Sequence, residues 1–259
     1  MNPLTVMPVW AVFLATVALC LIAVDAGFRF GRYRAGLEKK ETEKSVSTMV
    51  GATLGLLAFM LAFTFGSAAS RFGVRKQLVI DDANAVQAAY SRAELLPAPH
   101  AEAVQTLLEE YVDLRVQPTE SELQAVLERS KEIQDQIWAR TVALAHEYPE
   151  QWTVELFSDA VTYLVDRHNT RVIMSLHRPL PFAIVVALNT LLLLAMCMVG
   201  YQSGLTSERR TVASVILVIA FSVILTLIAE LDSVQGSLLG VNQRAMIEVQ
   251  NDIRRHSAD

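Results

Sequence analysis

Apolar residues fill four long stretches of the chain, and no charged residue interrupts any of them. The stretches cover residues 1–24, 45–70, 179–207 and 211–229, and they are 24, 26, 29 and 19 residues long. A helix of about 20 apolar residues crosses the hydrocarbon core of a bilayer. The pattern therefore predicts four membrane-spanning helices that pair into two hairpins, at about residues 7–28, 46–69, 180–203 and 211–230.

The first apolar stretch is expected to remain in the membrane as a helix. Cleaved signal peptides begin with a basic region, whereas residues 1–10 contain no lysine or arginine. The basic residues Arg29, Arg32 and Arg34 follow the apolar stretch instead. This order is typical of a membrane helix with a basic flank.

The residues between the two hairpins show the period of amphipathic helices. One stripe repeats at i, i+3, i+4, i+7 and i+8, as on one face of a helix; it consists of Val104, Leu107, Leu108, Tyr111 and Val112. Prolines at positions 97, 99, 118, 149 and 179 predict the breaks between the helices, because proline ends or kinks a helix.

The expected fold is an all-α membrane protein with a helical domain outside the membrane. We expect a first transmembrane hairpin (1–69), a helical extramembrane domain (70–178), a second transmembrane hairpin (179–230) and a polar tail (231–259). No cluster of glycine or proline separates the second span from Leu96, so this span is expected to continue beyond the membrane as one helix.

Composition excludes several classes of protein. Hydrophobic residues make up 53% of the chain and charged residues 19%, and the formal net charge is −5. The charged residues lie almost entirely outside the four apolar stretches. A soluble globule, a disordered chain and a nucleic-acid-binding protein with a basic surface are therefore excluded. We expect a multi-pass protein of the cell membrane, with the lipid bilayer as its surroundings.

Charge alone leaves open which side of the membrane holds the middle domain. The two short loops carry eight basic residues, and the flanks on the opposite side carry seven. The uncharged N-terminal flank of the first span favours short loops inside the cell and the middle domain outside.

Patterns typical of active sites and metal sites are absent from the sequence. It lacks the G-x-S-x-G, G-x-x-x-x-G-K and H-E-x-x-H motifs. The carboxylates Glu109, Glu110 and Asp113, and the pair Asp81 and Asp82, are interpreted as solvated helix faces. We therefore expect no enzymatic activity, no cofactor and no metal ion.

The second span carries a stripe of two glycines followed by two phenylalanines. Gly51, Gly55, Phe59 and Phe63 stand four residues apart, so they form one stripe along the helix. Glycines at this spacing let two membrane helices approach closely. Phenylalanines on the same stripe would form a hydrophobic constriction if copies of the helix surrounded an axis. Packing inside one subunit is the alternative interpretation.

Basic residues follow the second span, and they admit three interpretations. In a ring of subunits, Arg71, Arg75 and Lys76 would form a basic collar that attracts anions. Alternatively, their side chains reach the interface between membrane and water. In the third interpretation, Glu230 and Asp232 at the end of the fourth span form ion pairs with the basic residues and join the two hairpins.

Two further polar residues lie in or near the apolar stretches. Asp25 stands within one turn of the basic flank of the first span and is expected to pair there or to reach water. Asn189 lies deeper, in the third span. A side-chain amide in lipid needs a partner, so Asn189 predicts a hydrogen bond between helices or a hydrated path.

Several residues of the chain resemble a bacterial membrane family that is described as bestrophin-like. The resemblance rests on Leu54–Phe65, Arg71, Arg75, Asp82–Ala85, Tyr90, Tyr111, Val112, Arg171, Pro179, Leu231, Asp232 and Gly236. Bestrophins are pentameric anion channels with four membrane helices per subunit and an apolar neck on the second helix. The resemblance therefore implies a pentamer, small inorganic anions as permeant partners, a cytoplasmic middle domain and a location in a bacterial inner membrane.

The leading hypothesis is a homo-oligomeric ion channel that conducts anions, with the second span lining the pore. It depends on the stripe of glycine and phenylalanine, the basic collar and the resemblance. The alternative is a non-conducting membrane protein whose helical domain binds a partner or senses its environment.

Overall fold

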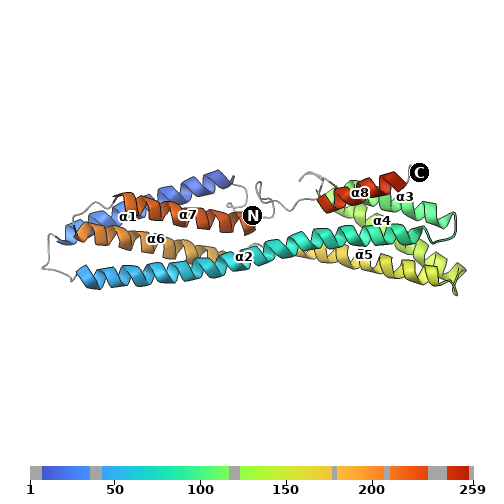
Figure 1. Cartoon of the computed structure of the whole chain (residues 1–259), viewed down its shortest axis with the longest axis horizontal. Coiled ribbons are helices and arrows are strands. Elements are labelled where there is room, and N and C mark those ends of the chain that lie inside the picture. Colours follow the sequence, from blue (N-terminus) through green and yellow to red (C-terminus); the bar gives the residue numbers. More distant parts are fainter. Residues whose placement is uncertain are drawn as a thin grey trace. The chain divides into compact units, whose positions relative to one another are not determined.

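The computed structural model describes residues 8–35, 43–116, 123–176, 180–206, 211–232 and 244–256, which form eight helices (Figure 1). In chain order these are α1 (Val9–Ala35), α2 (Glu43–Ala93), α3 (His100–Arg115), α4 (Leu123–Glu147), α5 (Trp152–Leu176), α6 (Phe182–Leu205), α7 (Thr211–Asp232) and α8 (Arg244–His256). The described residues contain no β-strand, in agreement with the predicted all-α fold. Pro118, Pro179 and Gly236, which the sequence singled out, lie outside the described residues.

Four of the helices are long and apolar enough to cross a membrane, namely α1, α2, α6 and α7. Each of them overlaps one of the four predicted spans, and α3, α4 and α5 follow the second span as expected. α2 continues for 51 residues without a break. At about 1.5 Å per residue it is about 75 Å long, more than twice the thickness of the hydrocarbon core.

The chain folds into two compact units. The first contains Met1–Phe72 and Arg178–Gly240, and the second contains Gly73–His177 and Val241–Asp259. The first unit thus includes α1, α6, α7 and the apolar part of α2. The second unit includes α3, α4, α5, α8 and the polar part of α2.

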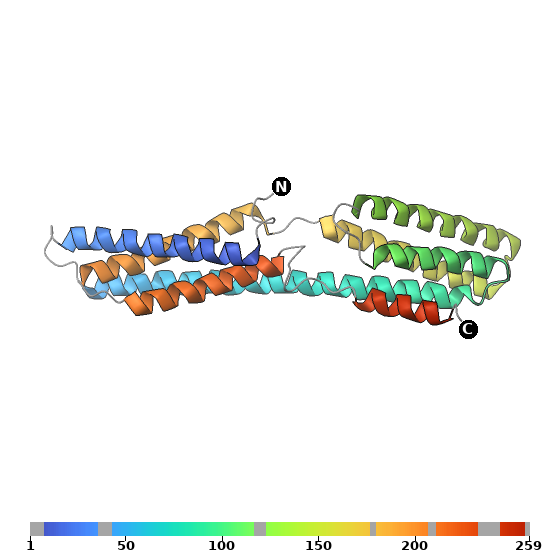
Figure 2. The ribbon, with the colours of Figure 1, turned by 90° about the horizontal axis from the view of Figure 1, so that it is seen from above.

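In the first unit, α1 packs against α6 and α7 (Figure 2). The contact between α1 and α6 depends on pairs of glycines, Gly27 and Gly31 on α1 and Gly200 and Gly204 on α6. A Cβ atom added at Gly27 would lie 2.0 Å from the backbone oxygen of Cys197. A real Cβ cannot approach a backbone oxygen so closely, so only glycine allows these two helix backbones to touch.

The rest of the first unit is held together by large apolar side chains. One side of α2 contributes Leu57 and Leu61, which are buried in the apolar core of this unit. Leu188 and Leu192 on α6 and Val218 on α7 belong to the same core. The apolar part of α2 therefore has one buried side.

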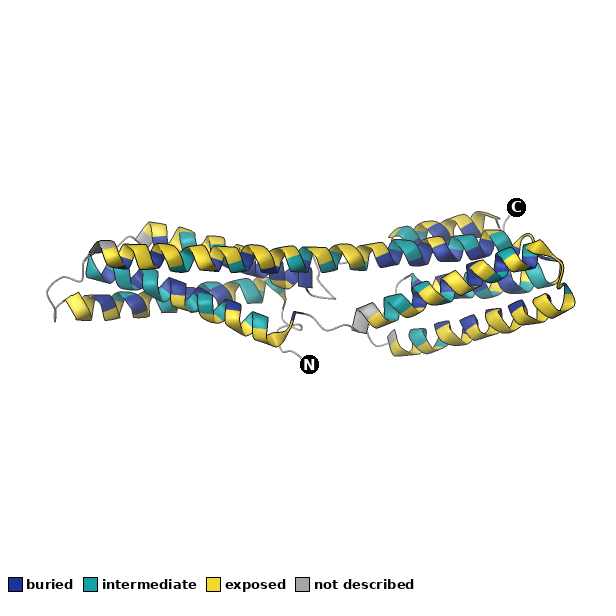
Figure 3. Cartoon of the chain, turned by 90° about the horizontal axis from the view of Figure 1, so that it is seen from below, coloured by how far each residue is buried: buried dark blue, intermediate teal, exposed yellow. Residues whose placement is uncertain are grey.

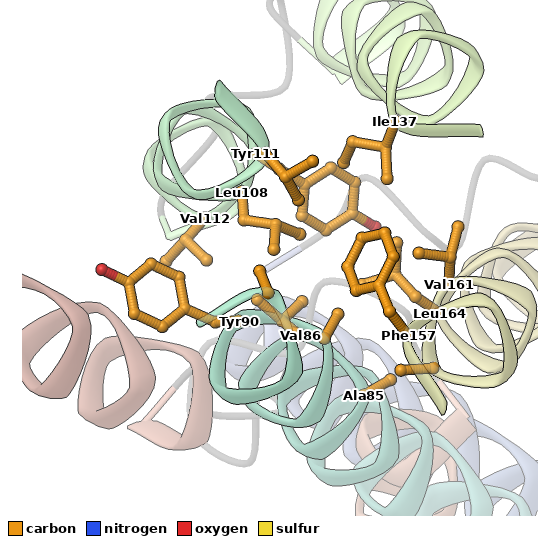
Figure 4. Close-up of a cluster of buried hydrophobic side chains, with 14 of the residues drawn as sticks. Ala85, Val86, Tyr90, Leu108, Tyr111, Val112, Ile137, Phe157, Val161 and Leu164 are labelled. Carbon is orange, nitrogen blue, oxygen red and sulfur yellow. The ribbon is translucent and has the colours of Figure 1, made fainter. Parts of the chain in front are cut away.

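In the second unit, aromatic and aliphatic side chains form a separate core. Tyr111 and Leu108 of α3 lie beside Phe157 of α5, Ile137 of α4 and Val86 of α2 (Figure 4). All five are fully buried. The polar part of α2 is therefore a component of this helical domain.

The polar tail contains a helix, α8, that was not expected from the sequence. Met246, Val249 and Ile253 of α8 are buried in the core of the second unit. Arg254 Nη2 lies 3.0 Å from Asp113 Oδ1, and Gln250 donates a hydrogen bond to the same carboxylate. α8 is thus docked on α3 through both apolar and polar contacts.

Adding one methyl group at the α1–α6 contact is expected to destabilise the first unit. In Gly200→Ala, the new Cβ would lie 2.0 Å from the backbone oxygen of Val24. The two helices would have to separate, at a cost of about 2 kcal/mol or more. Unfolding of the purified protein in detergent measures the change. Ala187→Leu adds more volume on the exposed side of α6 and is the matched control, which should unfold like the wild type. Equal stability of all three proteins would contradict the role of the glycines.

Candidate functional site

The stripe of glycine and phenylalanine on α2 faces away from its own subunit. Phe59 and Phe63 are 67% and 68% exposed. A Cβ atom added at Gly51 or Gly55 would meet nothing within 4 Å. The buried side of α2 is the opposite one, so packing inside the subunit does not account for this stripe.

Exposed residues recur along the whole of α2 (Figure 3), and one set of them has a spacing of seven residues. Seven residues make about two helical turns, so residues at this spacing lie on nearly the same side. Each of the following seventh residues is exposed: Met49, Leu56, Phe63, Ser70, Gln77, Asn84 and Ser91. The stripe is apolar up to Phe63 and consists of uncharged polar residues from Ser70 onward.

Small residues accompany the phenylalanines on this side of the membrane part of α2. Besides Gly51 and Gly55, a side chain at Gly66 would also meet nothing within 4 Å. Both helices expose large apolar residues, such as Ile22 on α1 and Leu56 on α2. The difference lies in the glycines, because those of α1 are buried against α6, whereas those of α2 are exposed. The exposed glycines give α2 a surface that is suited to close contact with another helix.

The basic residues beyond the membrane do not share one side of α2. Arg75 and Lys76 are consecutive and therefore point about 100° apart on a helix. Arg71 and Arg75 lie about 80° and 120° around the helix from Phe63, toward the buried side. Lys76 is exposed. The structure thus does not bring these three side chains together with the phenylalanine stripe.

Asp232 joins three helices of the first unit. Its Oδ1 lies 3.4 Å from Arg71 Nη1, and its Oδ2 accepts a hydrogen bond of 2.7 Å from the backbone nitrogen of Leu180. Asp232 is the last residue of α7, Arg71 belongs to α2, and Leu180 lies two residues before the start of α6. Glu230 on the same turn is also buried.

The other two polar residues of the spans bond within their own helices. Asp25 Oδ2 lies 2.7 Å from Arg29 Nε, four residues later, in an exposed pair. Asn189 donates a hydrogen bond of 2.8 Å from Nδ2 to the backbone oxygen of Val185. Neither contact links one helix to another.

The second unit contains a buried group of charges on α2, α3 and α5. Asp82 is fully buried, and its Oδ2 contacts the guanidinium groups of Arg115 and Arg171. Arg115 Nη2 lies 2.7 Å from this oxygen. The expectation that Asp82 belongs to a solvated face was wrong, because its carboxylate binds two arginines across the core.

A neutral histidine lies beside these charges. His168 Nδ1 is 3.0 Å from the hydroxyl oxygen of Tyr111, which also accepts a hydrogen bond from Gln134 Nε2. Burial, and then repulsion by Arg115, lower the pKa of His168 to about 4. Burial also raises the pKa of Tyr111. Both side chains are therefore uncharged at neutral pH.

The sequence did carry a signal for this cluster. Arg115 extends the apolar stripe of α3, three residues after Val112 and four after Tyr111. Arg171 similarly follows the stripe of α5 that contains Leu164 and His168. An arginine on the apolar side of a helix requires a buried partner, and Asp82 is that partner.

None of these arrangements resembles a metal centre. Among the described residues, no three His, Cys, Asp or Glu side chains are close enough together to hold a metal ion. The contacts of Asp232 and of Asp82 hold helices together. The exposed side of α2 is open to contact with other chains.

Comparison with solved structures shows which fold this is. No protein-family model matches the sequence, and no curated protein does. One variant of a bacterial bestrophin homolog from Klebsiella pneumoniae matches with a TM-score of 0.71 and 17% identity, over 96% of this chain and 98% of that chain. A second variant matches with a TM-score of 0.69 and 18% identity over the same shares. A crystal structure described as a membrane protein matches with a TM-score of 0.71 and 17% identity, over 97% and 99%.

The chain has a bestrophin fold. The similarity extends over nearly the whole of both chains, so the four spans and the helical domain are all parts of that fold. The bestrophin-like fold was expected from the resemblance of the sequence, and it is confirmed. With its four candidate spans, the chain has the fold of a multi-pass membrane protein.

Removing the buried carboxylate should destabilise the second unit of the bestrophin-like fold. Asp82→Asn would leave Arg115 and Arg171 without a counter-charge, and breaking a buried ion pair in this way costs about 3–5 kcal/mol. Asp113→Asn, which removes a partly exposed pair with Arg254, is the control and should cost less than about 1 kcal/mol. Denaturant unfolding of both variants checks the difference. An Asp82→Asn protein as stable as the control would contradict it.

Mild acid should destabilise the second unit through His168. An unfolded histidine takes up a proton near pH 6.5, whereas His168 in the folded protein does so near pH 4. Between these values the unfolded state binds more protons, so stability falls as the pH is lowered. Thermal unfolding at several pH values measures this loss. His168→Gln should show a smaller loss, and His146→Gln, at an exposed position, should behave like the wild type. Identical pH profiles for the three proteins would contradict this role.

Proposed function

We propose that this protein is a homo-oligomeric ion channel in which α2 lines the conducting path. The observation that carries the proposal is the continuous exposed stripe of α2. It is unpartnered within the subunit, rich in small residues inside the membrane part and polar beyond it. The bestrophin fold supports the proposal, because bestrophins are ion channels and the chain has the fold of a bestrophin homolog.

Two features favour a stripe that faces the central axis of an oligomer over one that faces lipid. Glycines at the exposed side of a membrane helix allow another helix to approach, whereas lipid contact favours large apolar side chains such as those on α1. Beyond the membrane, the stripe continues with Ser70, Gln77 and Asn84, whose side chains form hydrogen bonds with water. An aqueous path along copies of α2 accounts for both the small residues of the membrane part and the polar residues beyond it.

Phe59 and Phe63 are the proposed constriction of this path. Both rings are about two-thirds exposed in the single subunit. When several copies surround an axis, rings of phenylalanine narrow the path and exclude water from it. Such a constriction blocks ions without any charged residue at the gate.

The anion preference expected from the sequence depends on Arg71, Arg75 and Lys76. To attract anions along the path, these side chains would have to face it. Arg71 lies beside Asp232 instead, and Arg71 and Arg75 are directed toward the buried side of α2. The proposal therefore keeps the channel and the lining helix, and it does not depend on the basic collar.

Conductance in planar bilayers tests the proposal. The purified protein is expected to be an oligomer by mass measurement in detergent and in lipid, and to conduct ions. Replacing both rings, with Phe59→Ala and Phe63→Ala, should widen the constriction and increase conductance or open probability several-fold. The matched control is Phe182→Ala, which removes an equally exposed ring from α6 and should leave conductance unchanged.

Two results would overturn the proposal. One is a monomer without conductance in both detergent and lipid. The other is an oligomer in which a cysteine at position 63 stays unreactive to charged thiol reagents, because no aqueous path would then reach α2. The second result would favour a non-conducting protein whose helical domain binds a partner or senses its environment.

A further inference from the structure

We propose that the C-terminal end of α1 binds the headgroup of an anionic phospholipid. The site consists of Arg29, Arg32 and Tyr33, all in the last two turns of the helix. Its ligand is a lipid whose phosphate leaves it with a net negative charge, such as phosphatidylglycerol. The site is on a different helix from the exposed stripe of α2, so it does not depend on whether the protein conducts ions.

The three side chains lie on the side of α1 that faces away from the rest of the first unit. Gly27 and Gly31 mark the opposite side, because their backbones touch α6. At about 100° per residue, Arg29 lies about 160° around the helix from each glycine. Arg32 and Tyr33 lie about 60° and 40° from Arg29, one on each flank. All three side chains are exposed.

The same side of α1 is apolar within the membrane. Leu14 and Ile22 are both more than half exposed. Arg32 follows Leu14 by eighteen residues, which make about five turns, and lies directly in line with it. Tyr33 follows Ile22 by eleven residues, or about three turns. The apolar stripe that is available to lipid chains therefore leads straight to the arginine and the tyrosine.

The depth of the site in the membrane matches that of the headgroups. Residues 1–24 are uncharged, and Arg29 is the first basic residue after them. Long basic side chains at the end of a span extend to the interface between membrane and water. Tyrosine is enriched at the same level, where its ring meets the lipid chains and its hydroxyl meets the headgroups.

The chemistry of the site fits a phosphate. Arginine presents its donors in a planar fork that matches phosphate oxygens, and the tyrosine hydroxyl is a further donor. Asp25 Oδ2 lies 2.7 Å from Arg29 Nε and holds this guanidinium at the surface of the helix.

Positive charge predominates at this end of α1. Residues 8–35 contain one acidic and three basic residues. Residues 36–44 contain three of each and leave the excess unchanged. A basic residue close to a membrane surface strengthens the binding of anionic lipid by about 1 kcal/mol, or about fivefold. The excess therefore favours an anionic lipid over a zwitterionic one.

Native mass spectrometry of the full-length protein in detergent tests this inference, with phosphatidylglycerol and phosphatidylcholine of equal chain length as probes. The wild type is expected to bind phosphatidylglycerol about fivefold more tightly or better. Arg32→Gln should lower this preference about fivefold. Asp25→Asn should raise it by about the same factor, because it removes the negative charge beside Arg29. Both replaced side chains are exposed, so the fold should be retained.

Two controls separate the site from net charge and from free phosphate. Arg140→Gln makes the same change of charge at an exposed position of α4 and should keep the preference of the wild type. Sodium phosphate and sodium chloride at equal ionic strength should weaken lipid binding equally, because both only screen the charges.

Four results would overturn the inference. They are equal affinity of the wild type for both lipids, an unchanged preference in Arg32→Gln, an equal loss in Arg140→Gln, and stronger displacement of lipid by phosphate than by chloride. The last result would assign the arginines to a free anion. Lipid binding is measured without conductance, so each of these results leaves the channel proposal intact.

Discussion

An α-helix forms its backbone hydrogen bonds within itself, and this property governs the architecture of the protein. α2 leaves the hydrocarbon core and enters water without a break because no backbone group loses its partner on the way. Only its side chains change, from an uncharged apolar run before Ser70 to a mixture of charged, polar and apolar residues after it. One helix can therefore contribute to two cores that are built on different principles.

The two cores are stabilised in ways that suit their surroundings. Lipid offers little hydrophobic driving force between helices, so the first unit relies on close backbone contact at Gly27 and Gly200. In water, burial of apolar side chains drives assembly, and the second unit buries Tyr111 and Phe157. The same unit also encloses Asp82 with its two arginines. Such an ion pair adds little net stability but is costly to break, so it fixes which helices meet.

The architecture could be predicted from the sequence much better than the contacts. The four spans and the helical domain followed from apolar runs and prolines, because these signals are local. The glycine contact of α1 with α6 was not predicted, since Gly31 and Gly204 are far apart in the chain and only the fold brings them together. α8 was missed although Met246, Val249 and Ile253 have helical spacing, because a short amphipathic stretch in a polar tail is a weak signal.

The seven-residue repeat of the exposed stripe has a geometric consequence. An α-helix has 3.6 residues per turn, so positions seven apart drift by about 20° at each repeat and the stripe winds slowly around α2. Copies of α2 that keep this stripe toward a common axis must therefore cross one another as a left-handed supercoil rather than stand parallel. In such an assembly the width of the central opening depends on the tilt of the helices. A small change of tilt, shared by all subunits, would therefore widen or narrow the central opening without any movement of a separate gate.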